Sequence, residues 1–128
     1  MIKIIGSEDL ILLMNKHSAY LFNALPSSYT NCNIKNTITK NNSLKIIKNL
    51  VKSKDIIIVY CANSTCKASH EFIKNNLKGF KNVYLYSGGL YEWLLLQNYY
   101  GKDKFGTTGK CKIEKFKDYK HLPKKYYN

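Results

Sequence analysis

Cys61 stands where a strongly β-forming stretch gives way to a short polar loop and then to a helical pattern. Residues 56–60 read Ile-Ile-Ile-Val-Tyr, and Asn63, Ser64 and Thr65 form the loop. The first amides of a helix have no intrahelical partner, and the helix dipole adds partial positive charge at the same end. We therefore expect the helix after the loop to favour the thiolate of Cys61 and to lower its pKa.

The same helix amides can bind an anion, such as an oxyanion of sulfur, phosphorus or arsenic. Lys67, six residues after Cys61, adds a positive charge if its side chain turns toward the loop, and is otherwise a solvated lysine. A structural alternative also stays open, in which Cys61 is a small apolar residue at a strand end. Spacing alone does not choose between a reactive and a structural cysteine.

Cys66, five residues after Cys61, could attack an adduct on Cys61 and form a disulfide. This requires the two Cα atoms to lie within about 7 Å. The alternative, that Cys66 faces the core at the start of the helix, is slightly favoured because only spacing argues for pairing. Cys32 and Cys111 are predicted to be lone structural residues, and without a second closely spaced pair we expect no metal site.

The overall composition indicates one globular domain without a membrane anchor. The chain has 128 residues, and no stretch of 18 apolar residues that would predict a transmembrane helix. Its N-terminus lacks the pattern of a signal peptide. We therefore expect a cytoplasmic protein with no membrane partner, in a reducing compartment where disulfides are usually transient or catalytic.

The positive charge is carried entirely by lysine. The net charge is +13, all 21 basic residues are Lys, and the richness in Asn, Ile and Tyr suggests an A+T-rich coding sequence. Residues 101–128 interleave lysine with aromatic residues, namely Phe105, Phe116, Tyr119, Tyr126 and Tyr127. Such a segment can bind nucleic acid, but we expect instead a C-terminal extension that packs a few aromatics on a domain formed by residues 1–100.

Strands and helices that alternate along the chain must position Cys61. Hydrophobic patterns predict strands at 3–5, 19–25, 34–38, 55–60 and 82–86, with helices at 8–16, 43–53, from the cysteine loop to 77, and at 90–96. This alternation predicts an α/β domain with a central, mainly parallel sheet flanked by helices. Active sites in such sheets lie beyond the carboxyl ends of strands, which favours the reactive interpretation of Cys61.

Three motifs in a fixed order resemble the rhodanese family. Val-Tyr-Cys at 59–61 precedes a short loop and helix, Gly-Phe-Lys-Asn-Val-Tyr follows at 79–84, and Tyr-Ser-Gly-Gly-Leu-Tyr-Glu-Trp stands at 86–93. The order of the three is more specific than any one of them. The resemblance extends over about residues 3–98 and implies a single rhodanese-like domain.

Active members of the rhodanese family carry a cysteine that accepts a sulfane sulfur as a persulfide. The resemblance implies that Cys61 is this residue, and that thiosulfate or a similar small anion donates the sulfur to it. A thiol or cyanide would then accept it, and a protein thiol is among the acceptors. The implied anion cradle consists of the backbone amides of Ala62, Asn63, Ser64, Thr65, Cys66 and Lys67. No metal or organic cofactor is implied.

Three positions depart from the usual family pattern. Asn23 stands in place of an Asp, Asn33 stands where a His is common, and the cysteine loop lacks the usual Gly and Arg. Two alternatives therefore stay open. One is a cysteine-based reductase or phosphatase acting on an oxyanion, with Cys66 as resolving cysteine, although Lys67 lacks the planar fork of an arginine. The other is a non-catalytic binding module on the same fold.

Overall fold

Four parallel strands form the centre of the molecule, in the order β1-β5-β4-β2. The computed structural model describes residues 2–117. The strands are β1 (Lys3–Ile5), β2 (Tyr20–Asn23), β4 (Ile56–Tyr60) and β5 (Asn82–Tyr86). Their register pairs Tyr60 with both Asn23 and Tyr86, so the strands β2, β4 and β5 end together at one edge of the sheet.

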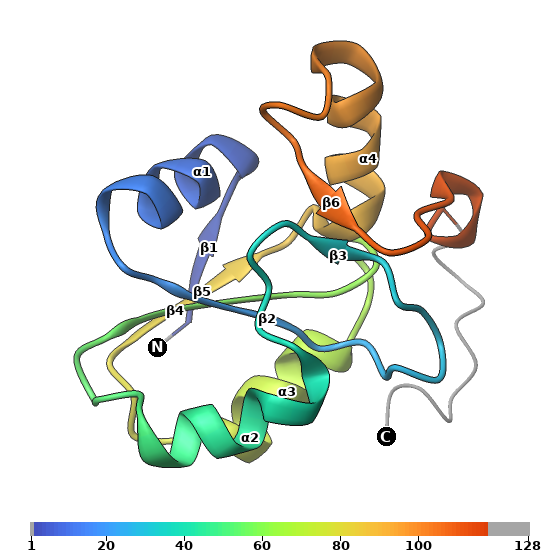
Figure 1. Cartoon of the computed structure of the whole chain (residues 1–128). Helices are drawn as coiled ribbons and strands as arrows, with labels where there is room; N and C mark the ends of the chain where they lie inside the picture. Colours follow the sequence, from blue (N-terminus) through green and yellow to red (C-terminus); the bar gives the residue numbers. More distant parts are fainter. Residues whose placement is uncertain (1, 118–128) are drawn as a thin grey trace.

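Helices cover both faces of this sheet. Figure 1 shows α2 (Lys40–Asn49) and α3 (Ala68–Asn76) on one face, with α1 (Ser7–Lys16) and α4 (Gly89–Tyr100) on the other. The central strand β4 is therefore covered on both sides, and its residues 57–60 are each 0% exposed. This explains why its sequence is continuously apolar instead of alternating. The α/β fold with a parallel sheet is confirmed.

A second, two-stranded sheet joins residues 33–34 to residues beyond 100. Strand β3 (Asn33–Ile34) pairs antiparallel with β6 (Thr107–Thr108), and a 3-10 helix, η1 (Ile113–Lys115), follows. Figure 1 shows β3 and β6 side by side next to α4. Residues 101–117, which we call the C-terminal segment, thus pack against the domain.

Two aromatic residues attach the C-terminal segment to the core. Phe105 and Phe116 are each 1% exposed, and the ring of Trp93 meets that of Phe105 edge-on at 4.9 Å between centroids. Both rings therefore belong to the hydrophobic core. The remaining aromatics of the predicted extension, Tyr119, Tyr126 and Tyr127, lie outside the described residues.

A disulfide joins Cys32 to Cys111, with 4.9 Å between their Cα atoms. The prediction that both are lone residues is therefore wrong. Cys32 directly precedes β3 and Cys111 follows β6, so the pairing of these short strands brings the two cysteines together. They are 79 residues apart, a distance at which sequence spacing carries no information on contact.

Several predicted elements differ in extent from those observed. The strand predicted over 34–38 ends at Ile34, because Thr37 turns back to donate a hydrogen bond to the Ile34 carbonyl (2.6 Å). Helix α4 extends to Tyr100 instead of ending near 96.

Across residues 2–117, no helix combines the length and apolar character needed to cross a membrane.

Candidate active site

Cys61 follows the last residue of β4 directly, at the carboxyl edge of the sheet. It is a free thiol and is only 2% exposed. Its Sγ lies 3.5 Å from Ser69 Oγ and 3.6 Å from the carbonyl oxygen of Cys66, within reach of a thiol hydrogen bond to either. The predicted position of Cys61, between a central strand and a helix N-terminus, is therefore found, but its thiol is deeply buried.

Asn63 determines the shape of the loop after Cys61. Its Oδ1 accepts hydrogen bonds from the amide (3.0 Å) and the hydroxyl (2.9 Å) of Thr65, and its carbonyl accepts one from the amide of Cys66 (3.2 Å). Its Nδ2 donates to the Phe116 carbonyl (2.8 Å), which ties the loop to the C-terminal segment. Two of the amides of the predicted anion cradle, those of Thr65 and Cys66, thus donate hydrogen bonds to Asn63.

The N-terminus of α4 holds the first two carbonyls of the loop. The amide of Leu90 donates to the Cys61 carbonyl and that of Tyr91 to the Ala62 carbonyl, each at 2.9 Å. Gly89 makes this approach possible, because it has φ +66° and an added Cβ would lie 2.6 Å from the Cys61 oxygen. Gly89 therefore positions the loop against the start of α4.

Cys66 faces Cys61 from the start of α3 and is also a free, buried thiol, 3% exposed. The hydrogen bond from the Cys61 thiol, reinforced by the backbone amides of Ala62, Ala68 and Ser69, lowers the pKa of Cys66 to about 7, although its burial opposes this shift. At neutral pH a large share of Cys66 is therefore thiolate.

The pKa of Cys61 shifts in the opposite direction. Burial, followed by the hydrogen bond to Cys66 and the charge of its sulfur, raises the pKa of Cys61 well above its usual range, against weaker opposing hydrogen bonds from Ser69. The sequence-based prediction of a lowered pKa for Cys61 is therefore wrong. Two adjacent thiols cannot both ionise readily, and Cys66 is better placed toward the amides of α3.

The other predicted site residues divide by exposure. Ala62 and Asn63 are buried, whereas Ser64, Thr65 and Lys67 are exposed. Lys67 caps the N-terminus of α3 with its backbone, and its side chain is open to solvent. Ser69 is a site residue that the sequence analysis missed; a serine in the first turn of the helix after a candidate cysteine is the signal that could have indicated it.

Asn23 and Tyr60 connect the edge of the sheet to β3. Asn23 Nδ2 donates to the Cys32 carbonyl (3.2 Å) and to Asn33 Oδ1 (3.0 Å). The Tyr60 hydroxyl accepts from the amide of Ile34 (2.9 Å) and lies 2.8 Å from Thr37 Oγ1. Asn23 and Asn33, which replace the usual Asp and His, thus hydrogen-bond to each other and join these strands.

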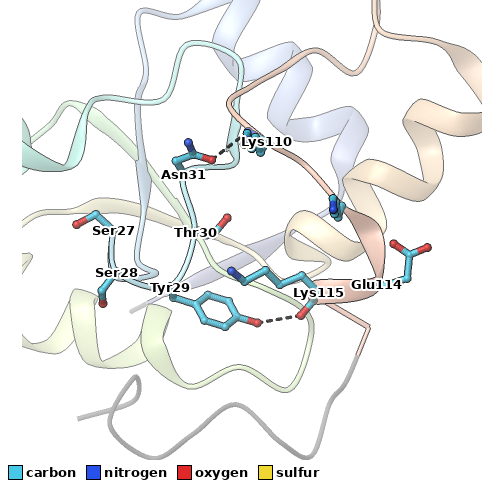
Figure 2. Close-up of a pocket in the computed structure, with 9 residues that line it drawn as sticks. Ser27, Ser28, Tyr29, Thr30, Asn31, Lys110, Glu114 and Lys115 are labelled. Carbon is cyan, nitrogen blue, oxygen red and sulfur yellow. Dashed lines mark hydrogen bonds between the residues drawn. The ribbon is translucent and has the colours of Figure 1, made fainter.

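A surface pocket of about 470 Å³ lies between residues 27–31 and the C-terminal segment (Figure 2). Lys110, Lys112 and Lys115 line it, and the Lys115 ammonium stands 4.6 Å from the centre of the Tyr29 ring. Tyr29 also donates to the Lys115 carbonyl (2.8 Å) and meets the Phe116 ring edge-on. The pocket therefore adjoins Phe116, the residue that Asn63 binds, but neither Cys61 nor Cys66 lines it.

Within residues 2–117, no group of three or more His, Cys, Asp or Glu side chains is arranged to hold a metal ion.

Comparison with known proteins agrees with this geometry. The sequence model of the rhodanese-like domain matches residues 18–96. A rhodanese-like domain from Anabaena sp. is similar in structure, with a TM-score of 0.60 at 18% identity over 89% of this chain and 83% of that one. A Bacillus halodurans protein gives a TM-score of 0.54 at 19% identity, over 96% of this chain and 87% of its own. No curated protein shows a significant match.

The two structural similarities concern the fold, whereas the sequence match covers more than half of the chain's 128 residues and includes both Cys61 and Cys66. The chain belongs to the rhodanese-like domain family.

Proposed function

We propose that the protein is a sulfurtransferase that carries a sulfane sulfur as a persulfide on Cys61. The observation that carries the proposal is a free cysteine directly after the central parallel strand, next to a helix N-terminus, in a chain of the rhodanese-like domain family. Covalent catalysis of this kind divides a difficult transfer into two easier ones and requires an activated nucleophile.

Cys66 supplies the activation in this proposal. Its thiolate accepts a hydrogen bond from the Cys61 thiol and can take that proton as a general base. The Cys61 thiolate then attacks the outer sulfur of thiosulfate. The sulfur–sulfur bond of thiosulfate breaks, its electron pair leaves with sulfite, and the outer sulfur stays on Cys61 as a persulfide.

The donor anion binds at the loop in front of α3. The proposed cradle is reduced to the amides of Asn63, Ser64 and Lys67, because Asn63 engages those of Thr65 and Cys66, and the amide of Ala62 binds the Cys66 sulfur. The ammonium of Lys67 adds a positive charge at the same helix end. The acceptor is a small thiol, cyanide or a cysteine of another protein, and the transfer requires no metal or organic cofactor.

The location that we propose for this chemistry is the cytoplasm, where reducing thiols keep Cys61 and Cys66 unbonded. The Cys32–Cys111 disulfide is uncommon in such a compartment. Alkylation of free thiols in intact cells, followed by fractionation and peptide mapping, tests this. The proposal expects the protein in the cytosolic fraction with Cys61 and Cys66 alkylated. Recovery of the protein in a secreted or lumenal fraction contradicts it.

The direct test of the function incubates the protein with thiosulfate, follows the mass of the intact protein by mass spectrometry and measures the sulfite released. We expect one sulfur atom to be transferred from thiosulfate and one equivalent of sulfite to be released. A Cys61→Ser variant should release none, whereas the Cys32→Ser, Cys111→Ser double variant, which removes both cysteines outside the site, should still release it. Equal sulfite release from the Cys61→Ser variant would assign the chemistry to another residue, and none from any variant would favour a non-catalytic binding module.

A second candidate is a cysteine-based reductase that acts on an oxyanion such as arsenate. The observation that favours it is the second free thiol, Cys66, beside Cys61. Turnover of arsenate in the presence of a thiol reductant, without sulfite release from thiosulfate, would favour this candidate over the first. The phosphatase alternative gains no support from Lys67, whose side chain is exposed to solvent.

A further inference from the structure

The four cysteines fall into two pairs with different states. Cys32 and Cys111 are bonded to each other beside the β3–β6 sheet, whereas Cys61 and Cys66 are free and buried at the carboxyl edge of the central sheet. The Asn63 turn brings the start of α3 back over the end of β4, so that Cys61 Sγ lies 3.6 Å from the Cys66 carbonyl and hydrogen-bonds to the Cys66 sulfur. Two adjacent reduced thiols in a substrate loop are the arrangement from which a disulfide forms.

We propose that Cys61 and Cys66 form a dithiol–disulfide couple, in which Cys66 attacks the Cys61 persulfide and releases its outer sulfur as hydrosulfide. This inference rests on the proposed function, since it requires a persulfide on Cys61. It differs in outcome, because the protein then reduces the sulfane sulfur instead of passing it intact to an acceptor.

The proposed step is balanced in atoms, electrons and charge. The thiolate of Cys66 attacks Cys61 Sγ, a disulfide forms between the two cysteines, and the bond from Cys61 Sγ to the outer sulfur breaks. The electron pair leaves with the outer sulfur, which takes the proton that Cys66 received earlier and departs as hydrosulfide. In this step the outer sulfur gains one electron and the Cys66 sulfur loses one. Cys61 Sγ exchanges one sulfur–sulfur bond for another and keeps its oxidation state.

The environment of Cys66 suits an attacking thiol. Thiol–disulfide exchange is fastest when the attacking thiol has a pKa near the ambient pH, because it is then both ionised and nucleophilic. In the reduced protein the pKa of Cys66 is lowered to about 7, chiefly by the hydrogen bond from Cys61, and in the persulfide only the backbone amides continue to lower it. The amides of Ala62, Ala68 and Ser69 hold its sulfur at the start of α3, next to the atom it attacks.

The oxidised couple must be reduced before the next turnover. The co-reactant is a thiol reductant, either two molecules of a small thiol or one dithiol, which becomes a disulfide as Cys61 and Cys66 return to thiols. Both cysteines are nearly fully buried, so we expect a small thiol to enter more readily than a protein thiol. Without a reductant the couple stops after one turnover.

The test compares wild type with Cys66→Ser and Cys66→Ala after exposure to thiosulfate without added thiol, starting from protein whose Cys61 and Cys66 are mapped as thiols. Wild type should release one equivalent of sulfide and lose the mass of two hydrogen atoms, and peptide mapping should find a Cys61–Cys66 disulfide. The two variants lack the base that activates Cys61, so they should load sulfur more slowly. After a prolonged incubation at raised pH they should keep the mass of one added sulfur on Cys61 and release no sulfide. Circular dichroism checks that each variant is folded.

The outcomes separate this inference from the function on which it rests. If wild type and both variants retain a stable persulfide on Cys61, the couple is refuted and the sulfurtransferase proposal stands. If neither the wild type nor either variant releases sulfite, the sulfurtransferase proposal fails. Oxidation with diamide then tests the couple without a sulfur donor. If Cys61 and Cys66 of the wild type remain separate thiols, the couple is refuted.

Discussion

The proton shared by Cys61 and Cys66 is the feature at the scale of residues on which the proposed chemistry depends. Burial alone disfavours a thiolate, and it raises the pKa of Cys61 accordingly. At Cys66 the hydrogen bond from Cys61 and three backbone amides overcome the burial. The loop thus assigns the negative charge to the second cysteine and keeps the first protonated until a base removes its proton.

The pH dependence of alkylation should reveal this assignment. A thiolate reacts and a thiol does not, so the rate of Cys66 alkylation by iodoacetamide should rise with pH through about 7, the lowered pKa of Cys66. Cys61→Ala removes the hydrogen bond that favours the thiolate and should move the midpoint to higher pH. Mass spectrometry of the Cys66 peptide measures the rate, and an unchanged midpoint in the variant would contradict the assignment.

Asn63 should contribute more to stability than its exposed neighbour Ser64. Asn63→Ala leaves the Phe116 carbonyl and the Thr65 amide without the hydrogen bonds that Asn63 makes to them. Loss of a buried hydrogen-bond partner costs about 1–3 kcal/mol, and the free energy of unfolding should fall by that order. Ser64→Ala, the matched control, should change it by less than about 0.5 kcal/mol. Urea unfolding of both variants decides, and equal effects would refute the role given to Asn63.

At the scale of elements, two helix N-termini meet at the cysteine loop. The start of α3 holds the Cys66 sulfur, and the amides of Leu90 and Tyr91 at the start of α4 hold the carbonyls of Cys61 and Ala62. One helix therefore stabilises charge and the other fixes the backbone. This division explains why Gly89 must approach the loop without a side chain.

Gly89→Ala should therefore be more damaging than the same change at Gly79. Both glycines have positive φ, +66° and +91°, which costs a non-glycine residue about 1–3 kcal/mol. Only at Gly89 does the added Cβ also meet backbone, 2.6 Å from the Cys61 oxygen, whereas nothing lies within 4 Å of it at Gly79. We expect a lower denaturation midpoint and slower sulfite release for Gly89→Ala. Equal midpoints for the two variants would contradict the close packing of α4 on the loop.

Sequence patterns predicted the elements that have long, periodic apolar runs. The continuous run 56–60 gave β4, and the helical spacing of Phe72, Ile73 and Leu77 gave α3. They did not predict β6 or its pairing with β3, because two-residue strands carry no periodicity. The position of Cys61 followed from the order strand, cysteine, helix. The direction of its pKa shift did not, because that depends on the burial of Cys61 and on Cys66 lying beside it.

At the scale of the whole molecule, the Cys32–Cys111 disulfide closes a ring of chain that contains the candidate site. The two cysteines are 79 residues apart and attach the C-terminal segment to the β2–β3 region. The same segment reaches the cysteine loop through Phe116, whose carbonyl binds Asn63. The site is therefore completed by residues from both halves of the chain.

Loss of this disulfide should lower stability without changing the cysteines of the site. In the loop-entropy account, a closed loop of this length stabilises the folded chain by about 4–5 kcal/mol, an upper expectation because the unfolded chain retains structure. The Cys32→Ser, Cys111→Ser double variant should unfold at lower urea concentration than the oxidised wild type. Urea titration with and without a reductant checks this, and identical midpoints for variant and oxidised wild type would contradict it.

The late position of Cys111 in the chain has a consequence for biosynthesis. A ribosome releases residues from the N-terminus onward, so Cys32, Cys61 and Cys66 all emerge before Cys111 exists to pair with Cys32. During that interval the nascent chain carries three thiols, and Cys32 can be joined to the wrong one. An oxidant that reaches the nascent chain can therefore join Cys32 to Cys61 or Cys66. In the completed chain Cys32 is bonded to Cys111 and cannot react with them.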